Sequence, residues 1–128
     1  MAKNKYKIVI VEDDMSISQM YKMKFELSGH DVLVAENGKI GLEVIQKADP
    51  DIVLMDLMMP EMTGDEALKV LRGISKYKDT QVMILTNVGH EESEKKLKGL
   101  NVLRYIVKAD MSPKQIVDVV TETLEKKK

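Results

Sequence analysis

The sequence contains no cysteine and no tryptophan, and it has only one phenylalanine and three prolines among its 128 residues. Without cysteine, the chain can form neither disulfide bonds nor thiolate metal sites. No apolar run reaches the ~18 residues that a membrane-spanning helix needs. The first seven residues are polar and lack the apolar stretch of a signal peptide. We therefore expect a cytoplasmic protein.

An excess of charge of one sign is also lacking, because 20 basic residues stand against 21 acidic ones. The formal net charge of −1 favours neither nucleic acid nor an anionic membrane as a partner. Hydrophobic residues make up 44% of the chain and include ten methionines, which predicts an aliphatic and adaptable core. The length suits a single domain over residues 1–128.

Short apolar runs rich in β-branched residues alternate with helical stretches along the chain. Such runs are typical of strands that are buried on both faces, and the alternation predicts a parallel sheet covered by helices on both sides. Functional residues are then expected beyond the carboxyl ends of the strands. The predicted strands are residues 8–11, 32–35, 52–55, 82–85 and 105–107, and the predicted helices are residues 16–27, 39–48, 64–74, 91–98 and from 113 onward.

Local signals mark several boundaries between these elements. Asn37-Gly38 predicts a turn. Ser112 is expected to cap the last helix, with Pro113 in its first position and Gln115 completing a capping box.

Polar residues follow four of the predicted strands at the point where each strand ends. They are the acidic run 12–14, Asp56, Thr86 and Lys108. If the first and third strands are neighbours, several carboxylates converge and repel one another. A Mg²⁺ ion with oxygen ligands would remove that cost, while Lys108 and Thr86 suit an incoming anion. Asp56 can then act as a nucleophile on phosphorus to give an aspartyl phosphate.

The order of these motifs resembles the CheY-like receiver domain of two-component response regulators. The resemblance covers roughly residues 6–124 without an evident gap, and it implies a flavodoxin-like (βα)5 fold with a five-stranded parallel sheet in the order 2-1-3-4-5. Each motif is weak alone, but their combination is specific. The matching stretches are VIVEDD (residues 9–14), DIVLMDLMMPEMTG (51–64), MILTN (83–87) and YIVKAD (105–110).

This resemblance implies a phosphorylation site and a Mg²⁺ site. Asp56 corresponds to the phosphoacceptor, and Asp13 to a direct ligand of Mg²⁺. Glu12 corresponds to a ligand that acts largely through water, and the backbone carbonyl of Met58 to a further ligand. The phosphodonor would be a sensor histidine kinase or a phosphotransfer protein.

The resemblance also implies a switch that carries the signal to a downstream protein. Thr86 corresponds to the switch hydroxyl, Lys108 to the lysine that pairs with phosphate, and Tyr105 to the aromatic switch residue. Pro60 and Gly64 belong to the loop after the phosphorylation site. The altered face would comprise the fourth helix, fifth strand and last helix. Such a domain is not an enzyme beyond its own phosphorylation and dephosphorylation, and it contacts neither membrane nor nucleic acid directly.

Some of these residues have simpler interpretations. The acidic run 12–14 also suits a helix N-terminus, and Asp14 is expected to have only that role. Tyr105 is equally typical of a half-buried core residue. His30 and His90 are predicted on the surface, because neither has a second ligand at metal-binding spacing.

Three other functions compete with a phosphorylated switch. An aspartate-nucleophile phosphatase of the haloacid dehalogenase type would need a second aspartate two residues after Asp56, where this chain has Met58. A receiver-fold interaction module that works without phosphorylation would usually have lost an acidic residue or the lysine, and all are present. The chain could equally be the receiver part of a larger regulator or hybrid kinase.

The chain departs from the family pattern after Lys108, where most relatives have proline and a cis peptide bond. Here the next residue is Ala109. A cis bond to a residue other than proline costs about 3 kcal/mol, so we predict a trans peptide. Asn87 also replaces a small residue, and Asn101-Val102 replaces a common Gly-Ala pair. None of these changes removes a reacting group.

Overall fold

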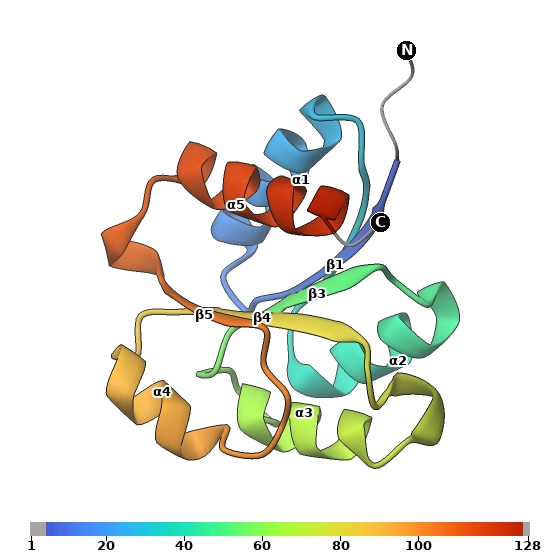
Figure 1. Ribbon diagram of the computed structural model, residues 1–128, viewed down its shortest axis with the longest axis vertical. Coiled ribbons are helices and arrows are strands. Elements are labelled where there is room, and N and C mark those ends of the chain that lie inside the picture. Colours follow the sequence, from blue (N-terminus) through green and yellow to red (C-terminus); the bar gives the residue numbers. More distant parts are fainter. Residues whose placement is uncertain (1–4, 127–128) are drawn as a thin grey trace.

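The computed structural model describes residues 5–126. Within this range, five parallel strands form one sheet in the order β2-β1-β3-β4-β5, which confirms the predicted fold class (Figure 1). The strands are β1 (Lys7–Val11), β2 (Asp31–Ala35), β3 (Ile52–Met55), β4 (Gln81–Thr86) and β5 (Arg104–Val107). The helices are α1 (Met15–Leu27), α2 (Gly38–Ala48), α3 (Gly64–Arg72), α4 (His90–Lys96) and α5 (Pro113–Lys126).

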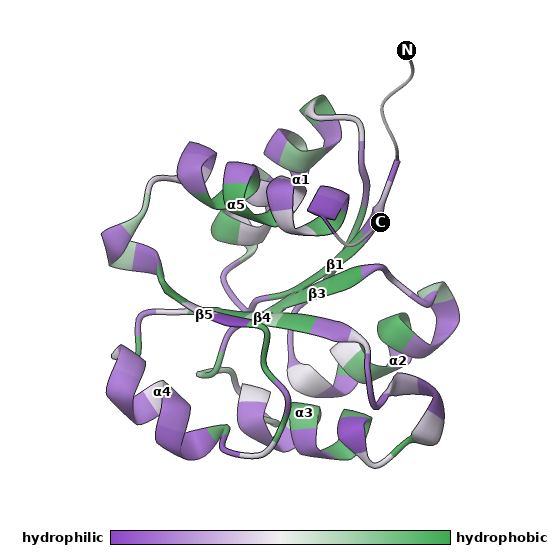
Figure 2. Ribbon diagram, viewed as in Figure 1, coloured by the Kyte–Doolittle hydropathy of each residue, from purple (hydrophilic) through white to green (hydrophobic). Residues whose placement is uncertain are grey.

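The helices form two layers around the sheet. Helices α1 and α5 cover one face, and α2, α3 and α4 cover the other (Figure 1). Alternate residues of β1 point to opposite faces of the sheet. Ile8 and Ile10 pack into the core beneath α1 and α5, whereas Val9 and Val11 pack into the core on the other face. Figure 2 shows the resulting pattern, in which the hydrophobic strands lie between helices with hydrophilic outer sides.

Side-chain caps define where several helices begin. Asp14 accepts hydrogen bonds from the backbone amides of Ser16 and Ile17, which confirms its predicted place at the start of α1. The backbone amide of Gln115 donates to the Ser112 hydroxyl at 3.2 Å, and the Ser112 amide donates to the Gln115 side chain at 2.8 Å. The predicted capping box of α5 is therefore confirmed.

Two local predictions were wrong. Asn37-Gly38 is not a free turn, because the Asn37 side chain accepts a hydrogen bond from the Ile40 amide at 2.8 Å and caps α2. His30 is not on the surface, since only 5% of it is exposed. Its Nδ1 accepts from the Tyr6 amide at 3.4 Å, and its Nε2 lies 3.4 Å from Oγ1 of Thr121 in α5.

Two other expectations, for His90 and for the peptide bond after Lys108, agree with the structure. His90 is exposed, as predicted. No peptide bond between residues 5 and 126 is cis, so the Lys108–Ala109 bond is trans as predicted. Over the same residues, no helix is both long enough and apolar enough to cross a membrane. The ends of the predicted single domain, residues 1–4 and 127–128, lie outside the described residues.

Candidate functional site

The carboxyl ends of the strands bring the predicted site residues together. In the sheet, Val11 of β1 is the register partner of Met55 of β3. The next residue of each strand continues this pairing, because the Asp56 amide donates to the carbonyl of Val11 at 3.0 Å. Glu12 and Asp56 therefore directly follow the ends of two neighbouring strands, at the carboxyl edge of the sheet. Glu12 and Asp56, which are far apart in the sequence, thus become neighbours because the strands are parallel and adjacent.

Three carboxylates gather at this edge. One carboxylate oxygen from each of Glu12, Asp13 and Asp56 lies within 4.8 Å of the other two. Glu12 and Asp56 are buried, at 4% and 7% exposure, whereas Asp13 is exposed. The structure therefore assembles the predicted acidic cluster, in which two side chains are buried and the third is exposed to solvent.

Lys108 places a positive charge between two of these carboxylates. Its Nζ donates a hydrogen bond to Oε1 of Glu12 and another, of 3.1 Å, to Oδ2 of Asp56. A short 3₁₀-helix over Lys108–Asp110 follows β5 and begins with this lysine. The single ammonium group of Lys108 donates to two carboxylates, and Asp13 adds a third. Negative charge therefore remains in excess at the site.

The electrostatics of the pocket follow from burial and from this contact. Burial raises the pKa of Glu12, although the hydrogen bond from Lys108 counteracts part of that rise. Burial alone would lower the pKa of Lys108, but the hydrogen bond to Glu12 and the charge of Asp56 outweigh it. The pKa of Lys108 is therefore raised, and the lysine stays charged at neutral pH.

A hollow of about 330 Å³ gives access to Asp56 from solvent, and it is lined by Asp56, Met58, Thr86, Asn87 and Val88. Thr86 is buried, and its hydroxyl oxygen accepts a hydrogen bond from the Val88 amide at 3.3 Å. The Met58 amide donates to Oδ1 of Asp56 at 3.3 Å, while the Met58 side chain is 59% exposed. The Asp56 carboxylate thus lies in an open hollow whose apolar lining comes from Met58 and Val88.

Gly64, the first residue of α3, fixes the loop that follows Asp56. Its amide donates to the carbonyl of Leu57 at 2.8 Å. A Cβ atom built at this position would lie 2.2 Å from the backbone oxygen of Asp56. Only glycine allows so close an approach, so this residue sets where the end of β3 lies.

Tyr105 lies in β5, away from the carboxylates. Its register partner is Ile84 of β4, and Thr86 pairs with Val107 in the same ladder. Tyr105 and Thr86 therefore lie on one face of the sheet, the face that α4 covers. One contact here was not predicted from the sequence: the ring of His90 packs edge to face against the ring of Tyr105. The one available signal was that His90 lies four residues after Thr86.

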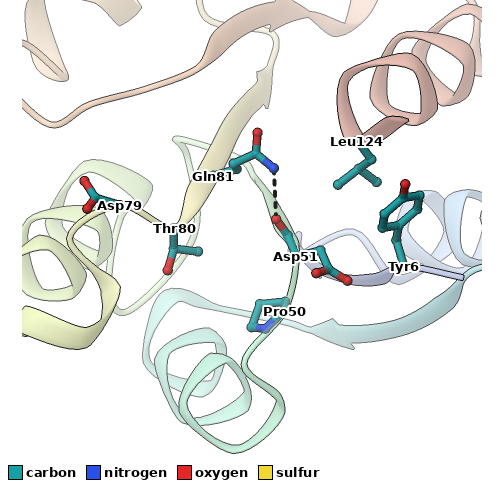
Figure 3. Close-up of a pocket in the computed structure, with 7 residues that line it drawn as sticks. All are labelled: Tyr6, Pro50, Asp51, Asp79, Thr80, Gln81 and Leu124. Carbon is teal, nitrogen blue, oxygen red and sulfur yellow. Dashed lines mark hydrogen bonds between the residues drawn. The ribbon is translucent and has the colours of Figure 1, made fainter. Parts of the chain in front are cut away.

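A second hollow, of about 310 Å³, lies at the opposite edge of the sheet. Figure 3 shows its lining, in which the side-chain amide of Gln81 donates to the backbone oxygen of Asp51 at 3.2 Å. This hollow lies at the amino ends of the strands and includes none of the predicted site residues. It therefore has no part in the acidic site.

The sequence matches the response regulator receiver domain family over residues 8–121. The chain belongs to this family. Its fold is close to that of the chemotaxis protein CheY4 of Vibrio cholerae, with a TM-score of 0.84 and 30% identity over 93% of this chain and 98% of that one. The BeF3-activated N-terminal receiver domain of RstA from Klebsiella pneumoniae gives a TM-score of 0.81 and 27% identity, with 92% and 97% of the two chains covered.

Among curated relatives, the phosphate regulon transcriptional regulatory protein PhoB of Pseudomonas aeruginosa is 34% identical over 112 residues. The match covers 86% of this chain and 48% of PhoB. The chain spans less than half the length of the curated relatives that it matches. The match to the family over residues 8–121 confirms the resemblance that was inferred from the motifs.

Proposed function

We propose that this receiver domain is a phosphorylation switch in which Asp56 accepts a phosphoryl group from the phosphohistidine of a histidine kinase or phosphotransfer protein. The observation that carries the proposal is the position of the Asp56 carboxylate. It lies at the base of an open hollow, within hydrogen-bonding distance of Lys108 and beside two further carboxylates. This arrangement offers a nucleophile, a cation and an acidic ion site in one place.

The residues at the site fit Mg²⁺. The donor set consists of carboxylate oxygens, which this hard cation prefers, and the excess of negative charge favours a divalent ion. Asp13, Asp56 and the Met58 carbonyl would hold the ion directly, with Glu12 acting largely through water. When bound, the ion supplies positive charge that offsets the charge of the phosphoryl oxygens.

The transfer forms one bond and breaks another. A carboxylate oxygen of Asp56 attacks phosphorus, and the bond between phosphorus and the donor histidine nitrogen breaks. That nitrogen keeps the electron pair, and the phosphoryl group becomes an aspartyl phosphate. Lys108 moves its hydrogen bond from Asp56 to a phosphoryl oxygen, and the Thr86 hydroxyl donates to another.

A movement of Thr86 would carry the signal from the phosphorylation site to the surface of the domain. In donating to a phosphoryl oxygen, Thr86 would move toward Asp56, and the Tyr105 ring would enter the space that it leaves. The face formed by α4, β5 and α5 would change and bind a downstream protein in the cytoplasm. Self-phosphorylation and autodephosphorylation would be its only reactions. Because the chain covers less than half of PhoB and similar relatives, a receiver part of a larger regulator fits equally well.

Intact-mass spectrometry tests the phosphoacceptor. After treatment with acetyl phosphate and Mg²⁺, the wild-type protein should gain the mass of one phosphoryl group, and chelation of Mg²⁺ should prevent the gain. Asp56→Asn should abolish the adduct. Asp118→Asn removes an exposed carboxylate of α5 and should leave it intact. An undiminished adduct in Asp56→Asn would contradict the assignment, and a wild type without any adduct would favour a phosphorylation-independent module.

A further inference from the structure

The first residue of α4 contacts the residue that we propose as the aromatic switch. The ring of His90 meets the ring of Tyr105 edge to face, with the ring centroids 5.3 Å apart and an angle of 79° between the ring planes. This is a preferred geometry for aromatic pairs, and it adds to the contribution of apolar burial. The contact therefore holds the Tyr105 ring in a defined place.

The surroundings of Tyr105 leave its ring between the sheet and α4. The ring is half-buried and packs against the core on the α4 side of the sheet. Burial raises the pKa of Tyr105, and the nearby negative charge of Glu94 adds to the rise. His90 and Glu94 lie one turn apart on α4, so both belong to the same face of the helix. His90 contacts the Tyr105 ring from that face, and Glu94 adds a negative charge nearby.

A chain of hydrogen bonds connects α4 to Thr86. The Val88 amide donates to the Thr86 hydroxyl oxygen at 3.3 Å, and the Val88 carbonyl accepts from the hydroxyl of Ser93 at 3.4 Å. Ser93 is the buried residue of α4. A shift of Thr86 toward Asp56 would pull on Val88 and, through Ser93, on the helix that carries His90.

We propose that His90 is a positioning residue for Tyr105, whose ring it holds against α4 until a shift of Thr86 displaces the helix. This inference rests on the proposed function, in which Tyr105 moves when Thr86 does. The contact favours the arrangement seen here by about 2- to 13-fold over one in which the rings are separated. His90 therefore sets how much phosphorylation signal is needed before Tyr105 moves.

Three variants separate this role from a general effect on α4. His90→Ala removes the ring, His90→Phe keeps an aromatic edge without the imidazole nitrogens, and Glu91→Ala alters an exposed neighbour on the same helix. The first readout is the NMR signals of the Tyr105 ring without any ligand. The second is the apparent affinity for beryllofluoride in the presence of Mg²⁺, measured from amide shifts of the pocket.

The expected result is specific to the ring. His90→Ala should shift the Tyr105 ring signals and raise the apparent affinity for beryllofluoride about 2- to 13-fold. His90→Phe and Glu91→Ala should stay close to wild type in both readouts. The proposal is overturned if His90→Ala leaves both readouts unchanged or lowers the affinity, or if His90→Phe behaves like His90→Ala.

Failure of the proposed function would give a different result from failure of the inference about His90. A wild-type protein that does not bind beryllofluoride at all would contradict the phosphorylation switch. In that case the Tyr105 ring signals, recorded without ligand, would still show whether His90 holds the ring.

Discussion

The Nζ atom of Lys108 lies 3.1 Å from Oδ2 of Asp56, although 52 residues separate the two in the sequence. The same ammonium group donates to Glu12, so one cation serves two buried carboxylates. The charge balance of the pocket therefore depends on Lys108 whenever no metal ion is bound. Removing this side chain would leave two carboxylates close together and without a counter-charge.

The first prediction concerns this balance. Lys108→Ala should lower the free energy of unfolding by about 3 kcal/mol in the absence of Mg²⁺, at the low end for a broken buried pair because the hollow admits water. Mg²⁺ should restore more stability to the variant than it adds to the wild type, since the ion no longer competes with the ammonium group. Urea unfolding followed by circular dichroism, with EDTA and with Mg²⁺, measures both effects.

A second lysine provides the matched control. Lys114 pairs with Asp118 on the exposed surface of α5, where the two side chains are 83% and 57% exposed. Lys114→Ala should cost at most about 1 kcal/mol, with no dependence on Mg²⁺. Equal losses in the two variants would show that Lys108 is not buried with its partners as described.

The second prediction concerns the backbone next to Asp56. Gly64→Ala should destabilise the fold by about 1–3 kcal/mol, because the new methyl group meets the Asp56 carbonyl and the end of β3 must shift. The rate of phosphorylation by acetyl phosphate should fall as well, since the carboxylate moves with its backbone. Urea unfolding and the rate of adduct formation measure the two effects.

Gly73→Ala serves as the control for this variant. The nearest atom to a Cβ at that position is 3.4 Å away, and the residue has a helical φ of −78°. It should affect neither stability nor phosphorylation by a comparable amount. A Gly64→Ala protein that is phosphorylated at the wild-type rate would mean that the loop relaxes without moving Asp56.

Much of the fold could be predicted because its signals are local. Buried parallel strands are continuous apolar runs, and the caps at Asp14 and Ser112 involve residues two or three positions away. The convergence of Glu12, Asp56 and Lys108 could also be predicted, because parallel strands bring their carboxyl ends to one edge. The order of the strands was inferred from the family resemblance.

Features that depend on tertiary packing could not be predicted from the sequence. His30 follows the turn after α1 and is polar, yet Phe25, Tyr6 and α5 enclose it. The His90–Tyr105 contact joins residues that lie on different elements, and no periodicity predicts such a pair. Asn37-Gly38 suits a turn and a helix start equally well, and in the structure Asn37 caps α2.

The third prediction uses the link between Asp49 and Tyr77. Asp49 ends α2, and its Oδ1 accepts a 2.7 Å hydrogen bond from the Tyr77 hydroxyl in the 3₁₀-helix Ser75–Tyr77. This bond, with a second one from Lys76, lowers the pKa of Asp49 below its ordinary value of 3.8. A carboxyl group whose pKa is lowered by folding stabilises the protein above that ordinary value, and the contribution disappears as the pH falls through the lowered one.

Asp49→Asn should therefore be less stable than wild type at neutral pH, and the difference should shrink as the pH falls below 3.8. Urea midpoints measured at several pH values for both proteins give this difference directly. Asp31→Asn, which loses only an exposed pair with Lys5, should show little difference at any pH. A gap between Asp49→Asn and wild type that stays constant into strong acid would contradict the proposed linkage.

The last prediction concerns the lifetime of the phosphorylated state. Hydrolysis of an aspartyl phosphate needs a water molecule in line with phosphorus, and water reaches Asp56 through the hollow that Met58 and Val88 help to line. Neither side chain can orient water, so we expect slow autodephosphorylation. Met58→Asn and Val88→Glu should each speed decay about tenfold, less than the ~10²–10⁴ of a well-placed general base.

The decay of the phosphorylated mass peak after removal of the phosphodonor measures this lifetime. Met58→Leu and Val88→Ile keep apolar rims of similar size and should decay at the wild-type rate. Faster decay in these two variants would mean that packing at the rim, rather than its polarity, controls the access of water. Unchanged decay in Met58→Asn and Val88→Glu would place the attacking water outside this hollow, because both side chains line it.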